Sequence, residues 1–381
     1  MEWIEKNAIE LYECSSGLSK AADQFGFGYP FLSYSDIFHN YYVPEKLLTL
    51  VNSTEKERKS CSVKRGDVFL TRTSETTDEL GMSCVALQDY PNATFNGFAK
   101  RLRPITNEIV PEYASYFFRS SYFRAQCMSL ASLITRASLN EGMIGRLKIR
   151  YPKSKDAQAK IGSILKNYGN LIENNNKRIK ILEQMAENLY KEWFVRFRFP
   201  GHETAPLENG IPKGWSEEKL SAVFEVKYGK DHKNIEDGLI PIFGSGGIMR
   251  YGNKALCSEE SVLIPRKGSL NNVMYYKGDF WTVDTMFYTK MKIKHCAKYT
   301  YFTLSKVDLV GLNSGASIPS MTTDILYHLK MIVPDESTLI AFDKQIDLLF
   351  AEKDRLELQN QNLIKQRDLL LPRLMSGKLA V

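Results

Sequence analysis

Residues 155–193 have the sequence KDAQAKIGSILKNYGNLIENNNKRIKILEQMAENLYKEW, which contains no proline. Steps that alternate between three and four residues select a row that is apolar or aromatic at every position but one: Leu165, Tyr168, Ile172, Asn175, Ile179, Leu182, Ala186, Leu189 and Trp193. This spacing is typical of a helix with a heptad seam that packs against another helix. The exception, Asn175, lies near the middle, where a polar residue costs stability but fixes the register.

Residues 342–374 have the same character near the other end of the chain. Their row is Phe342, Ile346, Leu349, Lys353, Leu356, Asn360, Leu363, Arg367, Leu370 and Leu374. One antiparallel alignment matches the two rows from Trp193–Phe342 to Leu165–Leu370 and places Asn175 opposite Asn360. We therefore predict one antiparallel coiled coil with an Asn–Asn layer. The alternative is two amphipathic helices that pack on separate domains.

The composition is that of a globular protein. The 381 residues are 43% hydrophobic and 25% charged, enough for two or three domains with cores of their own. No apolar run has the length of a membrane span, and the start, MEWIEKNAIELYE, is unlike a secretory signal. Six scattered cysteines without a CxxC pair argue against zinc and disulfides and predict a cytoplasmic location. The net charge of +7 is compatible with nucleic-acid binding.

The two halves of the chain repeat the same short segments in the same order. Residues 28–33 (GYPFLS) match 238–244 (GLIPIFG), residues 66–72 (GDVFLTR) match 260–266 (ESVLIPR), and residues 138–152 (SLNEGMIGRLKIRYP) match 320–334 (SMTTDILYHLKMIVP). Trp3 and Trp215 each begin a segment that we expect to be helical, ending at Gly17 and Gly229. The last copy of each set runs directly into its long helix. The chain is thus a tandem duplication with a period of about 190 residues.

We predict an α+β protein of two globular α/β units separated by a long antiparallel two-helix coiled coil. The arrangement is pseudo-two-fold and nearly circular, because the C-terminus returns beside Met1. The predicted domains are residues 1–152, the first globular unit; 153–196, the central helix; 197–213, a turn-rich linker; 214–334, the second globular unit; and 335–381, the C-terminal helix. The seam spans about 42 Å at about 1.5 Å per residue, close to one turn of DNA.

Signals of catalysis are missing from the sequence. There is no GxxxxGK[ST] phosphate loop, no HExxH metal motif, no GxSxG nucleophile and no Asn-Pro-Pro-aromatic segment. Pro334 and Asp335 resemble the start of a PD…ExK nuclease motif, but a long helix rather than a strand is predicted to follow. We expect no catalytic residue, no bound metal and no cofactor.

Polar, basic and glycine-rich loops lie at matching places in both halves, and these are the candidate DNA contacts. Arginine and asparagine side chains can bind base edges bidentately, whereas lysine, serine and threonine suit phosphates. In the first unit the candidates are Ser33, Tyr34, Thr71, Arg72, Thr73, Ser74 and Arg136. In the second they are Lys230, Gly244, Ser245, Gly246, Arg250, Tyr251, Arg266, Lys267, Ser269, Asn271, Asn272, Ser314 and Ser317. For any one of them, an ordinary surface turn is the alternative.

The whole chain resembles the specificity subunits of type I restriction–modification systems. The resemblance is strongest in residues 181–194 (ILEQMAENLYKEWF), 366–379 (QRDLLLPRLMSGKL) and 241–247 (PIFGSGG). It implies that each globular unit is a target recognition domain for one half of a bipartite DNA site. The two units differ in sequence, which implies an asymmetric site.

The same resemblance implies the partners. These are double-stranded DNA, two modification (methyltransferase) subunits that carry out adenine DNA methylation, and restriction subunits with motor and nuclease activity, without a membrane. The helices would be a spacer and a platform, with Phe194 to Arg198 and the coil surface as docking candidates. The chain itself would be non-catalytic. Two alternatives stay open: a stand-alone DNA methyltransferase or nuclease, and a coiled-coil protein adaptor without DNA binding.

Overall fold

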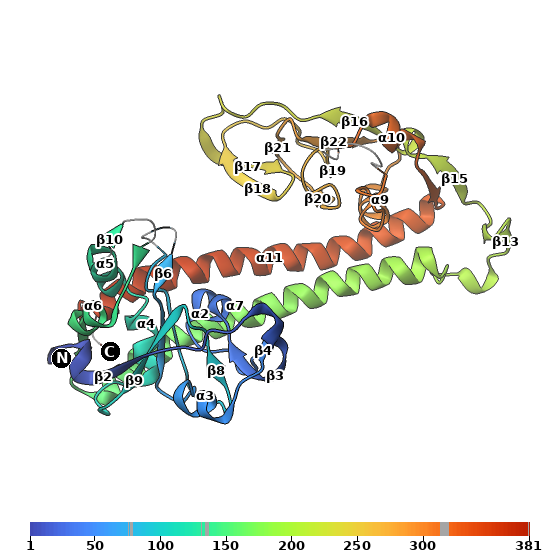
Figure 1. Cartoon of the computed structure of the whole chain (residues 1–381). Coiled ribbons are helices and arrows are strands. Elements are labelled where there is room, and N and C mark those ends of the chain that lie inside the picture. The colour runs from blue at the N-terminus through green and yellow to red at the C-terminus, as the bar shows by residue number, and fades with distance from the viewer. Residues whose placement is uncertain (75, 77–78, 131, 134–136, 313–319, 380) are drawn as a thin grey trace. The chain divides into compact units, whose positions relative to one another are not determined.

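The computed structural model describes residues 1–74, 76, 79–130, 132–133, 137–312, 320–379 and 381. The chain forms two compact units: unit 1 is Met1–Asn175 with Leu358–Val381, and unit 2 is Asn176–Glu357. Two long helices, α7 (Lys155–Tyr190) and α11 (Glu336–Met375), are each divided between the two units, with one segment in unit 1 and the other in unit 2 (Figure 1). Within the described part of the chain, no helix is long and apolar enough to cross a membrane.

Unit 1 is built on a four-stranded antiparallel sheet in the order β2-β9-β5-β7 and a three-stranded sheet in the order β4-β3-β8. The strands of these two sheets are β2 (Tyr12–Ser16), β9 (Ala99–Pro104), β5 (Val68–Thr71), β7 (Ser83–Val85), β4 (Leu50–Val51), β3 (Phe25–Leu32) and β8 (Thr94–Phe95). Smaller sheets join β1 (Trp3–Asn7) to β12 (Lys148–Pro152), and β10 (Ser132–Leu133) to β11 (Ala137–Ser138) and β6 (Thr73–Ser74). The short helices are α1 (Ala8–Leu11), α2 (Tyr34–His39), α3 (Glu55–Ser60), α4 (Pro111–Phe117), α5 (Ser121–Leu130) and α6 (Glu141–Arg146).

Unit 2 repeats this plan with the sheet orders β16-β22-β19-β20 and β18-β17-β21. Its strands are β16 (Phe224–Tyr228), β22 (Met286–Met291), β19 (Ser261–Pro265), β20 (Met274–Tyr276), β18 (Gly247–Gly252), β17 (Asp237–Gly244), β21 (Trp281–Thr282), the pair β15 (Ser216–Lys219) and β23 (Lys330–Val333), and the hairpin β13 (Leu207–Glu208) and β14 (Ile211–Pro212). Its short helices are α8 (Leu220–Val223), α9 (Ala297–Leu304) and α10 (Thr323–His328).

The two units share the topology of their two main sheets and of one two-stranded ladder. β3 and β17 each pair with one antiparallel and one parallel neighbour, and each carries an irregularity in the antiparallel ladder. β5 and β19 occupy the same place in their sheets, and β12 pairs with β1 as β23 pairs with β15. The predicted duplication and the mixed α/β fold class are therefore confirmed.

The segments that begin at Trp3 and Trp215 are not helical, contrary to expectation. Each is a strand, a single helical turn and a second strand: β1-α1-β2 and β15-α8-β16. Trp3 pairs with Pro152 and Ser216 pairs with Val333 in antiparallel ladders. Because the partner strand comes from the far end of each unit, local sequence preference does not reveal this pairing.

In unit 1, the first part of α7 runs antiparallel to the last part of α11. The Asn175 side-chain amide donates to Asn360 Oδ1 at 2.9 Å and to Gln359 Oε1 at 3.1 Å, as the predicted register requires. Nearer the unit's core, Ile161 and Leu165 share a cluster with Leu371, Leu374 and Met375. Arg367 extends over the ring of Tyr41 rather than into solvent.

In unit 2, the second part of α7 also runs antiparallel to the first part of α11. The ring centroids of Trp193 and Phe342 are 5.8 Å apart, again in the predicted register. Lys353 reaches outward to Glu183 at 2.9 Å, and Arg178 pairs with Glu352 at 2.7 Å. Ion pairs at the rim of an apolar seam favour one alignment of the two helices.

The two ends of the chain meet in unit 1. Gly377 packs so closely on the indole of Trp3 that an added Cβ would lie 2.5 Å from Nε1, and its φ is +76°. Both constraints require glycine at this position. The expected return of the C-terminus to the N-terminal strand is thus observed, and the topology is nearly circular (Figure 1).

A buried lysine ties the globular part of unit 2 to α11. Lys298 on α9 has a side chain that is 1% exposed, and its Nζ lies 2.6 Å from Asp343, 2.8 Å from Glu260 and 3.0 Å from Asp347. Burial alone would lower the pKa of Lys298, but the surrounding carboxylates outweigh this effect and raise it. The lysine therefore stays charged and holds three acidic groups together.

Removing one asparagine of the coil layer should destabilise the protein. We expect Asn175→Ala to lower the free energy of unfolding by about 1–3 kcal/mol, because Asn360 loses its buried partner. The double variant Asn175→Leu/Asn360→Leu should be neutral or stabilising, because a leucine layer is apolar on both sides. Urea unfolding followed by circular dichroism measures both, and equal losses in the two variants would contradict the paired layer.

Removing the buried lysine should cost more. Lys298→Met leaves the buried Asp343 and the half-buried Glu260 without this cation, and we expect a loss of about 3–5 kcal/mol in the free energy of unfolding. The matched control is Lys306→Met, which removes an exposed ion pair with Glu187 and should cost less than about 1 kcal/mol. Urea unfolding followed by tryptophan fluorescence compares them, and a similar small loss in both would show that the cluster is not structural.

Candidate nucleic-acid interface

Arg72 lies where β5 of unit 1 ends. Its backbone is held on both sides, since Arg72 N–H donates to Phe98 O at 3.1 Å and Leu139 N–H donates to Arg72 O at 2.9 Å. The side chain is half-buried and its Nε atom is fully buried. Among the residues that the structure describes, none accepts a hydrogen bond from this Nε. The backbone of Arg72 is thus held in place, while its Nε has no acceptor among the described residues.

A polar cavity of about 470 Å³ surrounds Arg72. Its other lining residues are Thr73, Lys100, Ser138, Leu139, Asn140, Glu141 and Gly142, from β6, β9, β11 and the start of α6. Lys100 is buried, and its Nζ lies 2.6 Å from Glu141 Oε1 and 2.7 Å from Ser16 Oγ. The cavity therefore combines a guanidinium that has no ion pair among the described residues with a carboxylate that is paired with Lys100.

Several predicted contacts in unit 1 are used inside the protein instead. Thr71 and Ser74 are buried and bonded to Glu79, and Ser33 caps α2 through Asp36. The Tyr34 hydroxyl donates to Thr73 O at 3.0 Å, and burial raises the pKa of this phenol. We correct the expectation that Thr71 and Ser74 face DNA: burial removes them from the surface. Arg72 and Thr73 are the candidates that line the cavity.

In unit 2 the structure brings two predicted loops together. The Asn272 side-chain amide donates to Ser245 O at 2.8 Å, and Gly268 packs against Ser245 Oγ. The loop that follows β19 therefore lies against the tight turn between β17 and β18. Gly244 is itself buried, so its role is to shape the turn, whereas Gly246 is exposed.

Arg266 is the counterpart of Arg72. It follows β19 as Arg72 follows β5, and its carbonyl accepts from Met321 N–H at 2.8 Å as that of Arg72 accepts from Leu139. Its guanidinium lies 5.5 Å from the ring centroid of Tyr228, an exposed aromatic residue. The ring holds the guanidinium over its face by a cation–π contact.

The remaining predicted residues of unit 2 fall into two groups. Arg250 of β18 braces the loop that precedes β17 by donating to the carbonyls of His232 and Ile235, and Asn271 is bonded to Asp308 and to Val310 N–H. These internal bonds explain both residues without a ligand. Exposed and free for contact are Lys230, Tyr251, Lys267 and Ser269. Three predicted contacts, Arg136, Ser314 and Ser317, lie outside the described residues.

Sequence reasoning missed Lys100, Glu141 and Tyr228. Lys100 comes from the middle strand of its sheet and Glu141 from the first turn of a helix, and only the fold brings them beside Arg72. Tyr228 could have been found from the sequence, because it lies only two residues before the predicted Lys230. It ends β16, in which buried and exposed residues nearly alternate.

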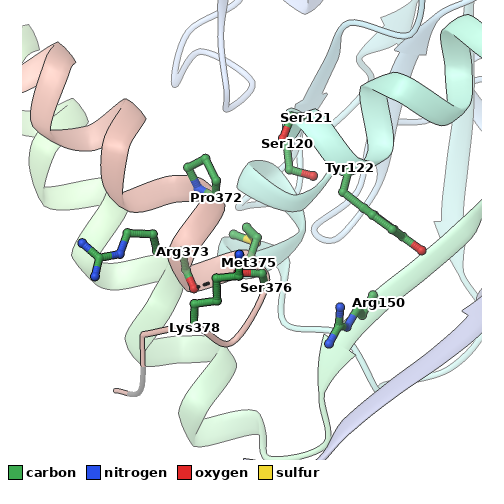
Figure 2. Close-up of a pocket in the computed structure, with 9 residues that line it drawn as sticks. All are labelled: Ser120, Ser121, Tyr122, Arg150, Pro372, Arg373, Met375, Ser376 and Lys378. Atoms are coloured by element: carbon green, nitrogen blue, oxygen red, sulfur yellow. Dashed lines mark hydrogen bonds between the residues drawn. The ribbon is translucent and has the colours of Figure 1, made fainter.

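A second basic hollow lies in unit 1, away from these loops (Figure 2). Arg150 of β12, Arg373 of α11 and Lys378 line it, together with Tyr122 and Ser120. Arg150 stacks on Trp3 at 5.0 Å, and Tyr122 donates to Glu5 at 2.8 Å. Its lining thus comes from β12, the start of α5 and the end of α11.

Comparison with known proteins identifies the family. The profile of the "Type I restriction modification DNA specificity domain" matches residues 9–184 and again residues 212–365. The chain belongs to the type I restriction–modification DNA specificity family. The two matched stretches correspond to the two repeats of the fold.

Relatives and a solved structure agree over nearly the full length. The chain is similar to the type I restriction enzyme MjaIX specificity subunit of Methanocaldococcus jannaschii, with 26% identity over 420 aligned positions that cover 100% of this chain and 94% of the relative. It is 20% identical to the HindI specificity subunit of Haemophilus influenzae, with 92% and 94% covered. The crystal structure of a type I system S subunit from M. genitalium superposes with a TM-score of 0.65 at 15% identity, covering 98% and 96% of the two chains. This likeness shows the fold.

In this member of the specificity family, the segment after α7 packs inside unit 2. Phe194 is buried against Tyr299 and Phe342, and Phe197 lies edge-on to Trp215. We therefore correct the expectation that Phe194 is a docking residue. The helices instead expose large apolar side chains elsewhere: Leu171, Leu358 and Leu369 in unit 1, and Ile181, Met185 and Leu348 in unit 2.

Asp335, the acidic residue of the nuclease-like dipeptide, is a helix cap. It precedes α11 and accepts hydrogen bonds from Thr338 N–H and Trp215 Nε1, both at 2.9 Å, and from the Ser337 hydroxyl. Burial alone would raise the pKa of Asp335, but these hydrogen bonds outweigh it and lower the pKa to about 2. Among the described residues, no group of three or more His, Cys, Asp or Glu side chains could hold a metal ion.

The cap makes a pH-dependent contribution. We expect Asp335→Ala to lower the free energy of unfolding by about 1 kcal/mol at neutral pH. Because the pKa in the folded protein lies below the unfolded value of about 4, the difference should be complete above pH 4 and vanish as the pH falls toward 2. Urea unfolding of both proteins between pH 2 and 7 checks this. A constant difference across that range would exclude ionised Asp335 as the cause.

Proposed function

We propose that this chain is the DNA-recognition and scaffold subunit of a type I restriction–modification complex in the cytoplasm. Each globular unit binds one half of a bipartite, asymmetric site on double-stranded DNA. α7 and α11 set the spacing between the half-sites and dock two methyltransferase subunits, to which restriction subunits are added. The chain contributes recognition and assembly, and its partners contribute the chemistry.

The pair Arg72 and Arg266 carries this proposal. Two copies of one fold each present an arginine at the end of the same strand, anchored by the same backbone hydrogen bond. Their surroundings differ: Lys100 and Glu141 accompany Arg72, whereas Tyr228 accompanies Arg266. Arginine is the side chain most used to bind guanine in the major groove. One scaffold with two different sets of neighbours is suited to two different half-sites.

The exposed apolar residues of the helices support the scaffold role. Leu369 is 71% exposed and Leu348 is 62% exposed, and both lie on α11. Contiguous apolar side chains, rather than ones exposed singly, mark surfaces that a partner protein covers, and Ile181 and Met185 lie one turn apart on α7. We assign these residues to the contacts with the methyltransferase subunits.

Replacing either arginine should weaken DNA binding in the half-site that its own unit contacts. We expect Arg72→Ala and Arg266→Ala each to cost about 1–3 kcal/mol in binding of the target duplex by the complex with methyltransferase subunits. The control Lys59→Ala removes one exposed positive charge from α3 of unit 1 and should have little effect.

The target is found by sequencing the methylated adenines of cells that express the whole system. A two-part motif is expected, and each arginine variant should lose discrimination in one part only. If both variants bind as tightly as wild type, the loops do not contact DNA. If the system yields no two-part motif, the chain is not a specificity subunit of the proposed kind.

A further inference from the structure

We propose that Arg72 and Glu141 together recognise one G·C base pair in the half-site bound by unit 1, with Arg72 donating to guanine and Glu141 accepting from cytosine. This inference rests on the proposed function and names the base pair that the unit 1 cavity selects.

Arg72 is a donor that lacks an internal acceptor. Its Nε is buried, yet no described residue accepts from it, and no ion pair of its guanidinium exists among the described residues. A buried N–H without a partner costs free energy. The side chain as a whole is half-buried and lines the cavity, where an acceptor on DNA can meet the guanidinium. Guanine offers two acceptors, O6 and N7, that match the arginine fork.

Glu141 supplies the complementary acceptor. Lys100, whose side chain is only 7% exposed, holds Glu141 Oε1 at 2.6 Å and so fixes the carboxylate at the cavity wall. The Glu141 side chain itself is 57% exposed, and within the described chain no hydrogen bond to its Oε2 occurs. A carboxylate repels phosphates but accepts well from the cytosine N4 amine. The cavity is therefore better suited to a base edge than to the DNA backbone.

Unit 2 lacks this arrangement although its fold is the same. Strand pairing places Tyr228 and Phe287 where unit 1 has Ser16 and Lys100. Asn140 and Thr322 cap the equivalent helices α6 and α10, so Thr323 stands where unit 1 has Glu141. The lysine–glutamate pair is thus specific to unit 1, and unit 2 serves as an internal control.

The test variant is Glu141→Gln, which keeps the shape and an acceptor for Lys100 but removes the charge. Glutamine presents both a donor and an acceptor, so it can bind adenine as well as cytosine. If the G·C pair is replaced by T·A, Arg72 can still donate to thymine O4. We expect the complex with methyltransferase subunits to bind the target more weakly than wild type does, because an amide oxygen accepts from the cytosine amine less strongly than a carboxylate. Its discrimination against replacing the cytosine of that pair by adenine should fall about tenfold or more.

Binding is measured at fixed salt with duplexes in which each pair of the half-site is replaced in turn. The half-site of unit 1 is the one in which Arg72→Ala loses discrimination, and thermal unfolding confirms that Glu141→Gln is folded. The control Thr323→Ala should leave that half-site unchanged. If Glu141→Gln does not fold, the double variant Lys100→Met/Glu141→Ala removes the whole pair and should lose the same discrimination.

Two results would overturn the inference while leaving the proposed function intact: a two-part motif whose unit 1 half-site has no G·C pair, or unchanged discrimination at every position in the variant. Absence of any two-part methylated motif for the wild-type system would instead overturn the proposed function.

Discussion

The packing of α7 on α11 is the contact on which both units depend. In unit 1, Leu165 of α7 and Leu374 of α11 belong to one core; in unit 2, Ala186 and Phe342 do. The core of unit 1 cannot be completed by a contiguous stretch of chain, because the end of α11 must return to it from residues 358–381. Unit 2 is contiguous from Asn176 to Glu357 and takes the second part of α7 and the first part of α11. The Asn175–Asn360 hydrogen bond adds a polar layer that satisfies both amides in only one alignment. A shift by one turn would bury an unpaired amide and separate Trp193 from Phe342.

Duplication of one topology explains how a single chain can carry two different binding surfaces. The sheets, the crossing of the first strand to the last, and the backbone bonds that hold Arg72 and Arg266 are the same in both units. What varies is the set of side chains around each arginine. Changes there leave the strand pairing intact, because the hydrogen bonds of a ladder involve only the backbone. Recognition can therefore change without changing the fold.

The candidate surface was only partly predictable from sequence. Arg72 and Arg266 were found because each ends a short apolar strand in matching segments of the two halves. Thr71 and Ser74 were misassigned because their burial is decided by the fold: β5, which ends at Thr71, is buried at all four positions, and Ser74 is buried in β6. Lys100 and Glu141 were missed because they are far from Arg72 in sequence and meet only through the pairing of β5 with β9 and the bond from Leu139 to Arg72.

The amino-acid sequence alone determined the two long helices, their shared register and the duplication. These are properties of local periodicity and of self-similarity, and they survive in any arrangement that buries the seam. The tertiary structure decided that the segments after Trp3 and Trp215 are strands and that Gly377 closes on Trp3. It also decided which loop residues remain available to a ligand. Each of these depends on contacts between distant segments, whose energies no local pattern contains.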